Sequence, residues 1–172
     1  MIEIIWYGRG GQGAFTAAKL LGAAYTLKDD SYYSIAFPSF GPERRGAPVR
    51  AFTKLDRKPI SDRSETEKAD YIIILDETLY SDSLKNLLKP NGKIIVNTKL
   101  KINNEVYSFD GNSISDSLKL PVVNTVMLGT ISALSEIVES DDIYKAIELY
   151  MPNQIQDRNK KAVFYAIKEV SE

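Results

Sequence analysis

Residues 8–13 read Gly8-Arg9-Gly10-Gly11-Gln12-Gly13, and this stretch decides how the chain is expected to fold. An apolar, β-rich run over residues 2–7 precedes it, and a segment of helix-forming composition over 14–27 follows it. The spacing Gly8-x-Gly10-x-x-Gly13 between a strand and a helix is typical of nucleotide-binding turns, where the backbone approaches a phosphate closely. The helix N-terminus adds free N–H groups and about half a positive charge. Tight packing of strand against helix also selects glycine, so the turn by itself leaves a structural role open.

The acidic residue that usually accompanies such a turn is missing. Dinucleotide-binding folds place Asp or Glu about 20 residues after the glycines, at the end of the second strand, where it holds a ribose. Here the second strand is predicted over 32–37, and it runs into Pro38, while Asp29 and Asp30 precede it. NAD is therefore disfavoured, and a phosphate-bearing ligand of another kind stays open.

Length, composition and charge indicate one ordinary globular domain over residues 1–172. A chain of 172 residues with 44% apolar residues can bury roughly 70% of its unfolded surface without disulfides. The net charge of −1 gives no general attraction to nucleic acid or to an anionic membrane. No apolar stretch approaches the roughly 20 residues that a membrane span needs, and the start of the chain has no basic leader. We expect a cytoplasmic protein.

Cysteine and histidine are both absent from the sequence. Without cysteine the chain has no thiol nucleophile and no ligands for an iron–sulfur cluster. Without histidine it lacks the most common general base and zinc ligand. We therefore assign no catalytic residue and no metal site to this chain, and we expect the demanding chemistry to lie on a cofactor or on another chain.

Strand and helix signals alternate along the chain, which favours an α/β fold. Strands are expected over 2–7, 32–37, 49–55, 71–75 and 93–97, with a weaker β signal over 101–109, and helices over 14–27, 79–88, 125–138, 143–150 and a last segment capped by Asp157. The strand over 49–55 alternates as a half-buried strand does, and the cluster at 89–92 is expected to stop the preceding helix. We predict a three-layer Rossmann-like domain, with a mostly parallel central sheet flanked by helices.

Several single residues carry structural expectations. Asn124 is expected to cap a helix, Asn159 to lie in the first turn of the last helix, and Gly129 to allow close helix packing. Ser140 or Asp141 is expected to cap the helix over 143–150. The carboxylates of Asp76 and Glu77 follow a strand end, where sites gather in α/β folds, but capping is favoured over catalysis.

Residues 37–50 form the second informative stretch. Three prolines and two glycines impose an irregular path between two strands, and Arg44, Arg45 and Arg50 crowd it with guanidinium groups. Such donors can clamp phosphates in a bidentate manner. They can equally hold a partner subunit, and the simplest interpretation is a rigid, solvated loop.

Two long motifs in the right order resemble the γ subunit of pyruvate (2-oxoacid):ferredoxin oxidoreductase, also called pyruvate synthase. The matching segments are residues 8–13 with Thr16-Ala17-Ala18, residues 40–49, Asp70, residues 124–129 and residues 159–162. The resemblance covers nearly the whole chain. It ranks this family above two alternatives, a stand-alone nucleotide- or coenzyme-binding module and a purely structural subunit.

The resemblance implies a hetero-oligomeric enzyme that decarboxylates a 2-oxoacid with thiamine diphosphate and magnesium, transfers the acyl group to coenzyme A and passes electrons through iron–sulfur clusters to ferredoxin. The γ chain is expected to hold none of these cofactors alone, to be inactive in isolation, and to join α, β and ferredoxin-like δ subunits. It is thought to help in assembly and in binding coenzyme A. Pyruvate is the first choice of substrate, ahead of branched-chain 2-oxoacids, 2-oxoglutarate and indolepyruvate.

The family context makes residues 8–13 and the arginines a candidate coenzyme A site. We expect Gly8 to shape the turn, and Gly10, Gly11, Gln12 and Gly13 to present backbone N–H groups to a phosphate. Charge-assisted contacts would come from Arg9, Arg44 and Arg45. Contact of Arg44 and Arg45 with an α or β subunit is an equal alternative.

Overall fold

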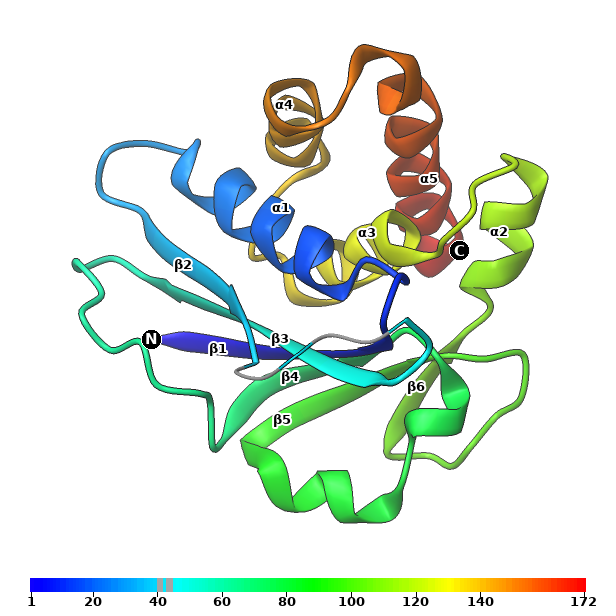
Figure 1. The fold of residues 1–172 in the computed structure, drawn as a ribbon, viewed down its shortest axis with the longest axis horizontal. Coiled ribbons are helices and arrows are strands. Elements are labelled where there is room, and N and C mark those ends of the chain that lie inside the picture. The colour runs from blue at the N-terminus through cyan, green and yellow to red at the C-terminus, as the bar shows by residue number, and fades with distance from the viewer. Residues whose placement is uncertain (40–41, 43–44) are drawn as a thin grey trace.

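The computed structural model describes residues 1–39, 42 and 45–172 of the chain (Figure 1). The described residues form a six-stranded sheet in the order β2-β3-β1-β4-β5-β6. The strands are β1 (Ile2–Arg9), β2 (Tyr33–Pro38), β3 (Pro48–Asp56), β4 (Ala69–Ile74), β5 (Leu88–Asn97) and β6 (Val106–Phe109). The β1 strand, which leads into the glycine turn, therefore lies in the middle of the sheet.

The sheet is mixed but mostly parallel, as predicted. β1 pairs in parallel with β4, β4 with β5, and β5 with β6. β3 runs antiparallel to both of its neighbours, β1 and β2, so it alone among the described strands is reversed. The carboxyl ends of β1, β4, β5 and β6 consequently meet at one edge of the sheet.

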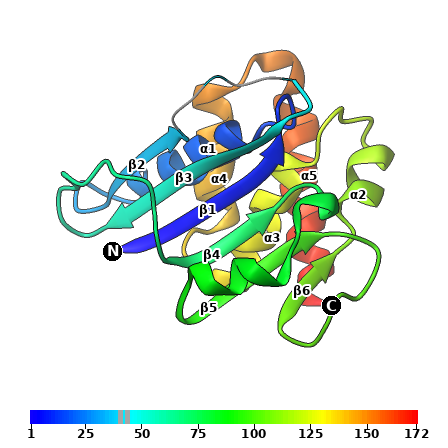
Figure 2. The same cartoon turned by 60° about the horizontal axis from the view of Figure 1, so that its bottom comes forward.

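The α-helices cover one face of the sheet (Figure 1). They are α1 (Ala14–Thr26), α2 (Gly111–Ser117), α3 (Asn124–Ser135), α4 (Ser140–Tyr150) and α5 (Asn153–Ser171). Turning the molecule places these helices behind the strands (Figure 2). The opposite face carries the short 3-10 helices η1 (Glu77–Leu79) and η2 (Asp82–Leu87). The expected third layer is thus much thinner than in a sheet flanked by long helices on both sides.

The core is divided by the sheet into two apolar clusters. Ile4 and Trp6 of β1 face the helices, while Ile5 faces the opposite side, and all three side chains are fully buried. The Trp6 Nε1–H donates to Thr53 Oγ1 at 3.0 Å, so the indole keeps a partner inside the core. This burial on both faces explains the apolar run Ile4-Ile5-Trp6 in β1.

The half-buried interpretation of residues 49–55 is wrong. Residues 51–55 of β3 are buried on both faces, and even the Lys54 side chain is 1% exposed. Its Nζ lies 2.7 Å from Asp62 Oδ2 and 3.6 Å from Glu3 Oε1, and these carboxylates make burial of the charge tolerable. The alternating pattern misled because a lysine in a strand normally marks a solvent-facing side.

The helix predicted over 79–88 is also wrong, because the segment lies in η1 and η2 with two extended residues, Tyr80 and Ser81, between them. The Tyr80 hydroxyl donates to Asp82, and the hydroxyls of Ser81 and Ser83 lie 2.6 Å apart. Such local side-chain bonds compete with a continuous α-helix.

The expected break at residues 89–92 is instead a bulge inside β5. Ala69 pairs with Leu88 and Tyr71 with Lys93, so the extra residues of β5 loop out between these two pairs. Asn91 takes a left-handed φ of 66° there. A bulge absorbs residues that cannot join the ladder while the strand continues on both sides.

The helix termini differ from the predicted caps. Glu139 precedes α4, and its N–H donates to Asp142 Oδ2 at 3.0 Å, so neither Ser140 nor Asp141 is the cap. α5 begins at Asn153 after Pro152, which places Asp157 inside the helix, 2.9 Å from Lys161. The short α2 escaped prediction, although the Asp110 side chain caps it by accepting from the Ser113 N–H.

Close contact between α3 and α5 confirms the role expected of Gly129. A Cβ on Gly129 would lie 2.9 Å from the Val163 carbonyl oxygen and 3.0 Å from Ala166 Cβ. Beside this contact the Thr125 hydroxyl donates to Asn159 Oδ1 at 2.7 Å. Asn159 is 5% exposed and lies beyond the first turn of α5, so its side chain ties two helices together and the first-turn expectation is wrong.

Candidate functional site

The glycine turn lies at the carboxyl end of β1 and leads directly into α1. Gly11 and Gly13 have φ values of 91° and 79°, a left-handed backbone that favours glycine. Gly8 is closely surrounded, since a Cβ there would lie 3.3 Å from Leu75 Cδ1. The sequence pattern therefore predicted both the position of the turn and its backbone geometry.

Asn124, which is distant in sequence, contacts and supports the glycine turn. Its Nδ2 donates to the Gly13 carbonyl oxygen at 3.2 Å, and its Oδ1 accepts from the Thr125 N–H at 2.9 Å. A Cβ on Gly13 would lie 2.4 Å from that Nδ2. The prediction that Asn124 caps a helix is wrong, because Asn124 is the first residue of α3 and Val123 is the cap. The Asn124 side chain contacts the glycine turn instead.

A network of polar side chains braces the turn against the end of β4. The Arg9 N–H donates to Gln12 Oε1 at 2.7 Å, and the Gln12 Nε2 donates to Asp76 Oδ2 at 3.1 Å. The Arg9 guanidinium donates to the Gly46 carbonyl oxygen and the Thr78 hydroxyl, and its Nε lies 3.4 Å from Asp76 Oδ2. Asp76 also accepts from the Thr78 N–H at 3.0 Å, which confirms its capping role. Arg9 and Gln12 thus mainly support the turn.

The last described residues of the loop between β2 and β3 (the second loop), Arg45, Gly46 and Ala47, lie beside the glycine turn. The Gly10 N–H donates to the Ala47 carbonyl oxygen at 2.8 Å, and the Gly46 N–H donates to the Gly10 carbonyl oxygen at 3.0 Å. Arg45 Cγ lies 4.0 Å from the position of a Cβ on Gly11. Arg44, the other predicted arginine, lies outside the described residues.

Internal hydrogen bonds reduce the set of N–H groups that the turn can offer to a ligand. Those of Gly10 and Gln12 donate to the carbonyl oxygens of Ala47 and Arg9. In the described part of the chain, the N–H groups of Gly11 and Gly13 have no acceptor, and no side chain caps α1. The predicted donor set therefore narrows to Gly11, Gly13 and the first turn of α1.

A cavity of about 560 Å³ opens next to the turn, at the carboxyl ends of β4 and β5. Its described lining is Gln12, Leu75, Asp76, Glu77, Thr78, Asn97, Thr98, Lys99, Leu100, Asn112, Ser115, Asp116, Leu120, Pro121, Val122 and Val123. Crevices at this edge are where α/β sheets bind ligands. Asn97, which the sequence reasoning missed, is 3% exposed and donates to the Leu75 carbonyl oxygen. The sequence signal that could have indicated Asn97 is a polar residue at the end of an apolar strand.

The charges of this cavity differ from those of the turn. Asp76, Glu77 and Asp116 belong to its described lining, against one cation, Lys99. Burial opposes ionisation of Asp76, but hydrogen bonds from Thr78 and Gln12 and the nearby Arg9 outweigh it and lower the pKa of that carboxyl. The lining is therefore a poor environment for a phosphate, whereas Arg45 and the free N–H groups of the turn favour one.

Two further properties limit the chemistry of the described residues. They contain no group of three or more His, Cys, Asp or Glu side chains placed to hold a metal ion. None of the helices formed by residues 1–39, 42 and 45–172 is long and apolar enough to cross a membrane.

The mostly parallel sheet and the glycine turn define a Rossmann-like α/β domain whose strand-to-helix turn has no side-chain cap. Residues 3–169 match the family model described as pyruvate ferredoxin/flavodoxin oxidoreductase. The chain belongs to this family, as a γ-type subunit of a 2-oxoacid:ferredoxin oxidoreductase.

Similar proteins match along almost the whole chain. Pyruvate synthase subunit PorC of Methanothermobacter marburgensis is 40% identical, over 99% of this chain and 98% of its own length. The common γ subunit of the pyruvate/ketoisovalerate oxidoreductases of Pyrococcus abyssi is 37% identical, over 94% and 93%. The crystal structure of pyruvate oxidoreductase subunit PORC from Thermotoga maritima superimposes with a TM-score of 0.81 at 32% identity, over 97% and 95%. The mixed, helix-flanked sheet is thus a property that the chain shares with a solved relative.

Proposed function

We propose that this chain serves a pyruvate:ferredoxin oxidoreductase, where it helps to bind coenzyme A and to assemble the complex. The observation that carries the proposal is the full-length similarity to pyruvate synthase subunits. A 2-ketoisovalerate activity is the second candidate, because the Pyrococcus subunit is common to both enzymes. The complex would oxidatively decarboxylate its 2-oxoacid to acyl-coenzyme A and CO2, and reduce ferredoxin.

The cofactors of that reaction belong, in this proposal, to the other subunits. Thiamine diphosphate, magnesium and iron–sulfur clusters would be held by the α, β and ferredoxin-like δ chains. The absence of cysteine and histidine from the sequence supports this division, because this chain has no ligands for a cluster. The expected compartment of the complex is the cytoplasm.

Coenzyme A would place a phosphate group on the glycine turn. The supporting geometry is the pair of N–H groups of Gly11 and Gly13, which have no acceptor among the described residues, at the start of a helix without a side-chain cap. Arg45 beside Gly11 would add a charge-assisted contact. Arg9 and Gln12 would act indirectly, by holding the turn in shape.

The neighbouring cavity would accept a neutral part of the same ligand. Its carboxylates disfavour a phosphate, but the amide N–H groups of the pantetheine arm can donate to carboxylates. The phosphate at the turn and the arm in the cavity would then lie on adjacent parts of one surface, because Gln12 belongs to both.

The test is the substitution Arg45→Ala in the assembled enzyme, with CoA-dependent 2-oxoacid oxidation followed by reduction of a viologen dye. We expect the apparent KM for coenzyme A to rise about tenfold, as loss of one charge-assisted contact implies. The KM for the 2-oxoacid should not change. Arg63→Ala is the matched control, because Arg63 is also exposed but lies in the loop between β3 and β4.

The same experiment separates ligand binding from assembly. If Arg45 instead holds an α or β subunit, the variant would lose co-purification of that subunit, while surviving complexes would keep the normal KM for coenzyme A. If both properties stay unchanged, Arg45 is removed from the ligand proposal. A purely structural subunit would tolerate substitution throughout the glycine turn and the second loop.

A further inference from the structure

β2 is an edge strand, and its hydrogen-bonding geometry shows which backbone groups are open. The Ser39 N–H donates to the Arg50 carbonyl oxygen at 2.9 Å, in register with the β2–β3 ladder. Bonded and non-bonded pairs alternate in an antiparallel ladder, so Ile35 and Phe37 bond to β3. The N–H and C=O groups of Ser34 and Ala36 therefore point away from the sheet.

This edge is protected against strand addition only at its end. Proteins block exposed edges with charged side chains, prolines, bulges or very short strands. The sequence of β2, Tyr33–Pro38, contains no charged residue, and its register with β3 is regular over all six residues. Pro38 removes one outward donor at the end of the strand, which leaves Ser34 and Ala36 as the open segment.

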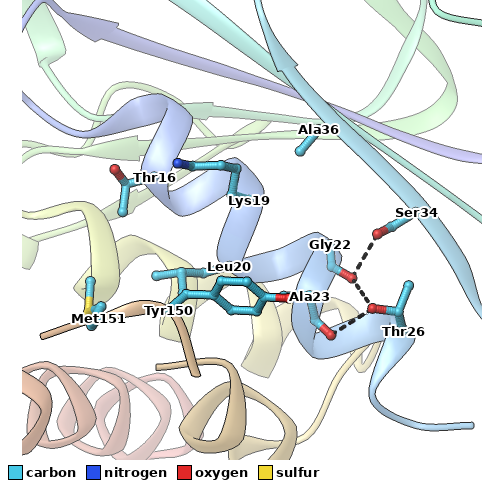
Figure 3. Close-up of a pocket in the computed structure, with 10 residues that line it drawn as sticks. All are labelled: Thr16, Lys19, Leu20, Gly22, Ala23, Thr26, Ser34, Ala36, Tyr150 and Met151. Atoms are coloured by element: carbon cyan, nitrogen blue, oxygen red, sulfur yellow. Dashed lines mark hydrogen bonds between the residues drawn. The ribbon is translucent and has the colours of Figure 1, made fainter. Parts of the chain in front are cut away.

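A groove runs beside this edge, along the outer surface of α1 (Figure 3). Its volume is about 420 Å³, and its described lining is Thr16, Lys19, Leu20, Gly22, Ala23, Thr26, Ser34, Ala36, Tyr150 and Met151. Ser34 and Ala36 lie on one side of α1, and Tyr150 and Met151 on the other (Figure 3). A strand added to β2 would project every second side chain over α1 and into this groove.

The groove has one charge, the ammonium of Lys19. This group lies 4.6 Å from the centroid of the Phe15 ring, and no carboxylate among the described residues forms an ion pair with it. Tyr150 also lines the groove, is 69% exposed and offers an aromatic surface there. Such a lining complements an extended segment that carries an acidic side chain next to an apolar one.

We propose that β2 accepts an extended acidic segment of another subunit of the oxidoreductase as an additional strand. Its backbone would bond to Ser34 and Ala36, its carboxylate would pair with Lys19, and its apolar side chain would contact Ala23 and Tyr150. Main-chain bonds supply affinity in this mode of recognition, and the pocket supplies specificity. A second copy of this chain paired through β2 fits less well, because β2 contains no acidic side chain that could pair with Lys19.

Amide exchange in the purified, assembled enzyme tests the backbone part of the proposal. Compared with the isolated chain, the Ser34 and Ala36 amides should exchange at least tenfold more slowly in the complex. The Ile35 amide, which faces β3 in both forms, is the internal control. Equal exchange at Ser34 and Ala36 in the two samples would overturn the proposal.

Carbodiimide cross-linking identifies the occupant. The reagent condenses the Lys19 amine with a carboxylate in contact to form an amide, and the carbodiimide takes up the water that is released. The expected product joins Lys19 to an Asp or Glu of a different subunit. A link to a second copy of this chain, or no link from Lys19 while other lysines react, would contradict the proposed partner.

The substitution Ala36→Pro tests the strand pairing directly, because it removes an outward N–H and leaves the bonds to β3 intact. Ala36→Ser keeps this N–H and is the matched control. We expect at least a tenfold weaker association with the partner subunits for Ala36→Pro alone. Equal association of both variants would refute strand addition, and exchange and cross-linking on the unaltered enzyme decide the matter if Ala36→Pro does not fold.

Discussion

At the scale of single residues, Gly13 combines two constraints that one glycine satisfies. Its φ of 79° is left-handed. Its Cα also lies against the side chain of Asn124, a residue 111 positions later in the sequence. The first constraint is local and the second tertiary. The fingerprint Gly8-x-Gly10-x-x-Gly13 therefore reflects packing as well as any ligand.

The substitution Gly13→Ala separates these constraints when compared with Gly46→Ala. Gly46 has a similar φ of 81°, but a Cβ there would meet nothing within 4 Å among the described atoms. We expect Gly46→Ala to cost about 1–2 kcal/mol of unfolding free energy, the price of a left-handed non-glycine residue. Gly13→Ala should cost about 2 kcal/mol more, because the Asn124 contact must also yield. Urea denaturation measures both, and equal losses would contradict a steric role of Asn124.

Asp76 links the glycine turn to the end of β4, and its lowered pKa makes this link dependent on pH. A carboxyl whose pKa is lower in the folded state stabilises the fold above its unfolded pKa, about 3.9, and loses this effect as pH falls through the folded pKa. Asp76→Asn should therefore destabilise the chain by about 1 kcal/mol at pH 7. The difference from the unaltered chain should shrink as pH falls below about 4.

Asp116→Asn provides the control for this pH dependence. Asp116 lines the same cavity, but its side chain is exposed and forms no ion pair with the described residues. Its substitution should change the unfolding free energy little at either pH. A difference for Asp76→Asn that stays constant from pH 7 to pH 3 would show that the charge of Asp76 does not contribute.

At the scale of secondary-structure elements, local sequence predicted the long helices and buried strands better than the irregular segments. β1, α1 and α3 lie close to the expected ranges, because their patterns agree with their burial. The helix predicted over 79–88 does not form, because hydroxyl and carboxylate side chains of residues 80–83 form local hydrogen bonds. The burial of Lys54 could not be predicted, because its two carboxylate partners come from other segments of the chain.

Gly129→Ala tests whether packing or helix propensity decides at the α3–α5 contact. Propensity alone would stabilise α3 by up to about 1 kcal/mol. The new Cβ would instead approach Val163 and Ala166 at 3.0 Å or less, so we expect a net loss of about 1–3 kcal/mol. Thermal and chemical denaturation give the sign. A gain in stability would mean that the two helices separate at little cost.

At the scale of the whole molecule, the proposed single domain over 1–172 predicts one cooperative unfolding transition. The helices α1, α3, α4 and α5 share one buried cluster with the central strands, and the C-terminal α5 packs on α3. The calorimetric enthalpy, about 0.7 kcal/mol per residue near 60 °C, should equal the van't Hoff enthalpy. Two resolved transitions in the purified chain would contradict a single domain.

The sequence by itself determined the α/β class, the position and backbone shape of the glycine turn, and the lack of cysteine and histidine ligands, because each depends on residue type or local spacing. Only the tertiary structure decided that Arg45 lies beside Gly11, that Asn124 supports Gly13, and that Asp76 bonds to Gln12. It also decided which turn N–H groups already have acceptors. The physical reason is that these contacts join segments far apart in the chain. They form because β1 pairs with β3 and β4 and because α3 packs behind the turn.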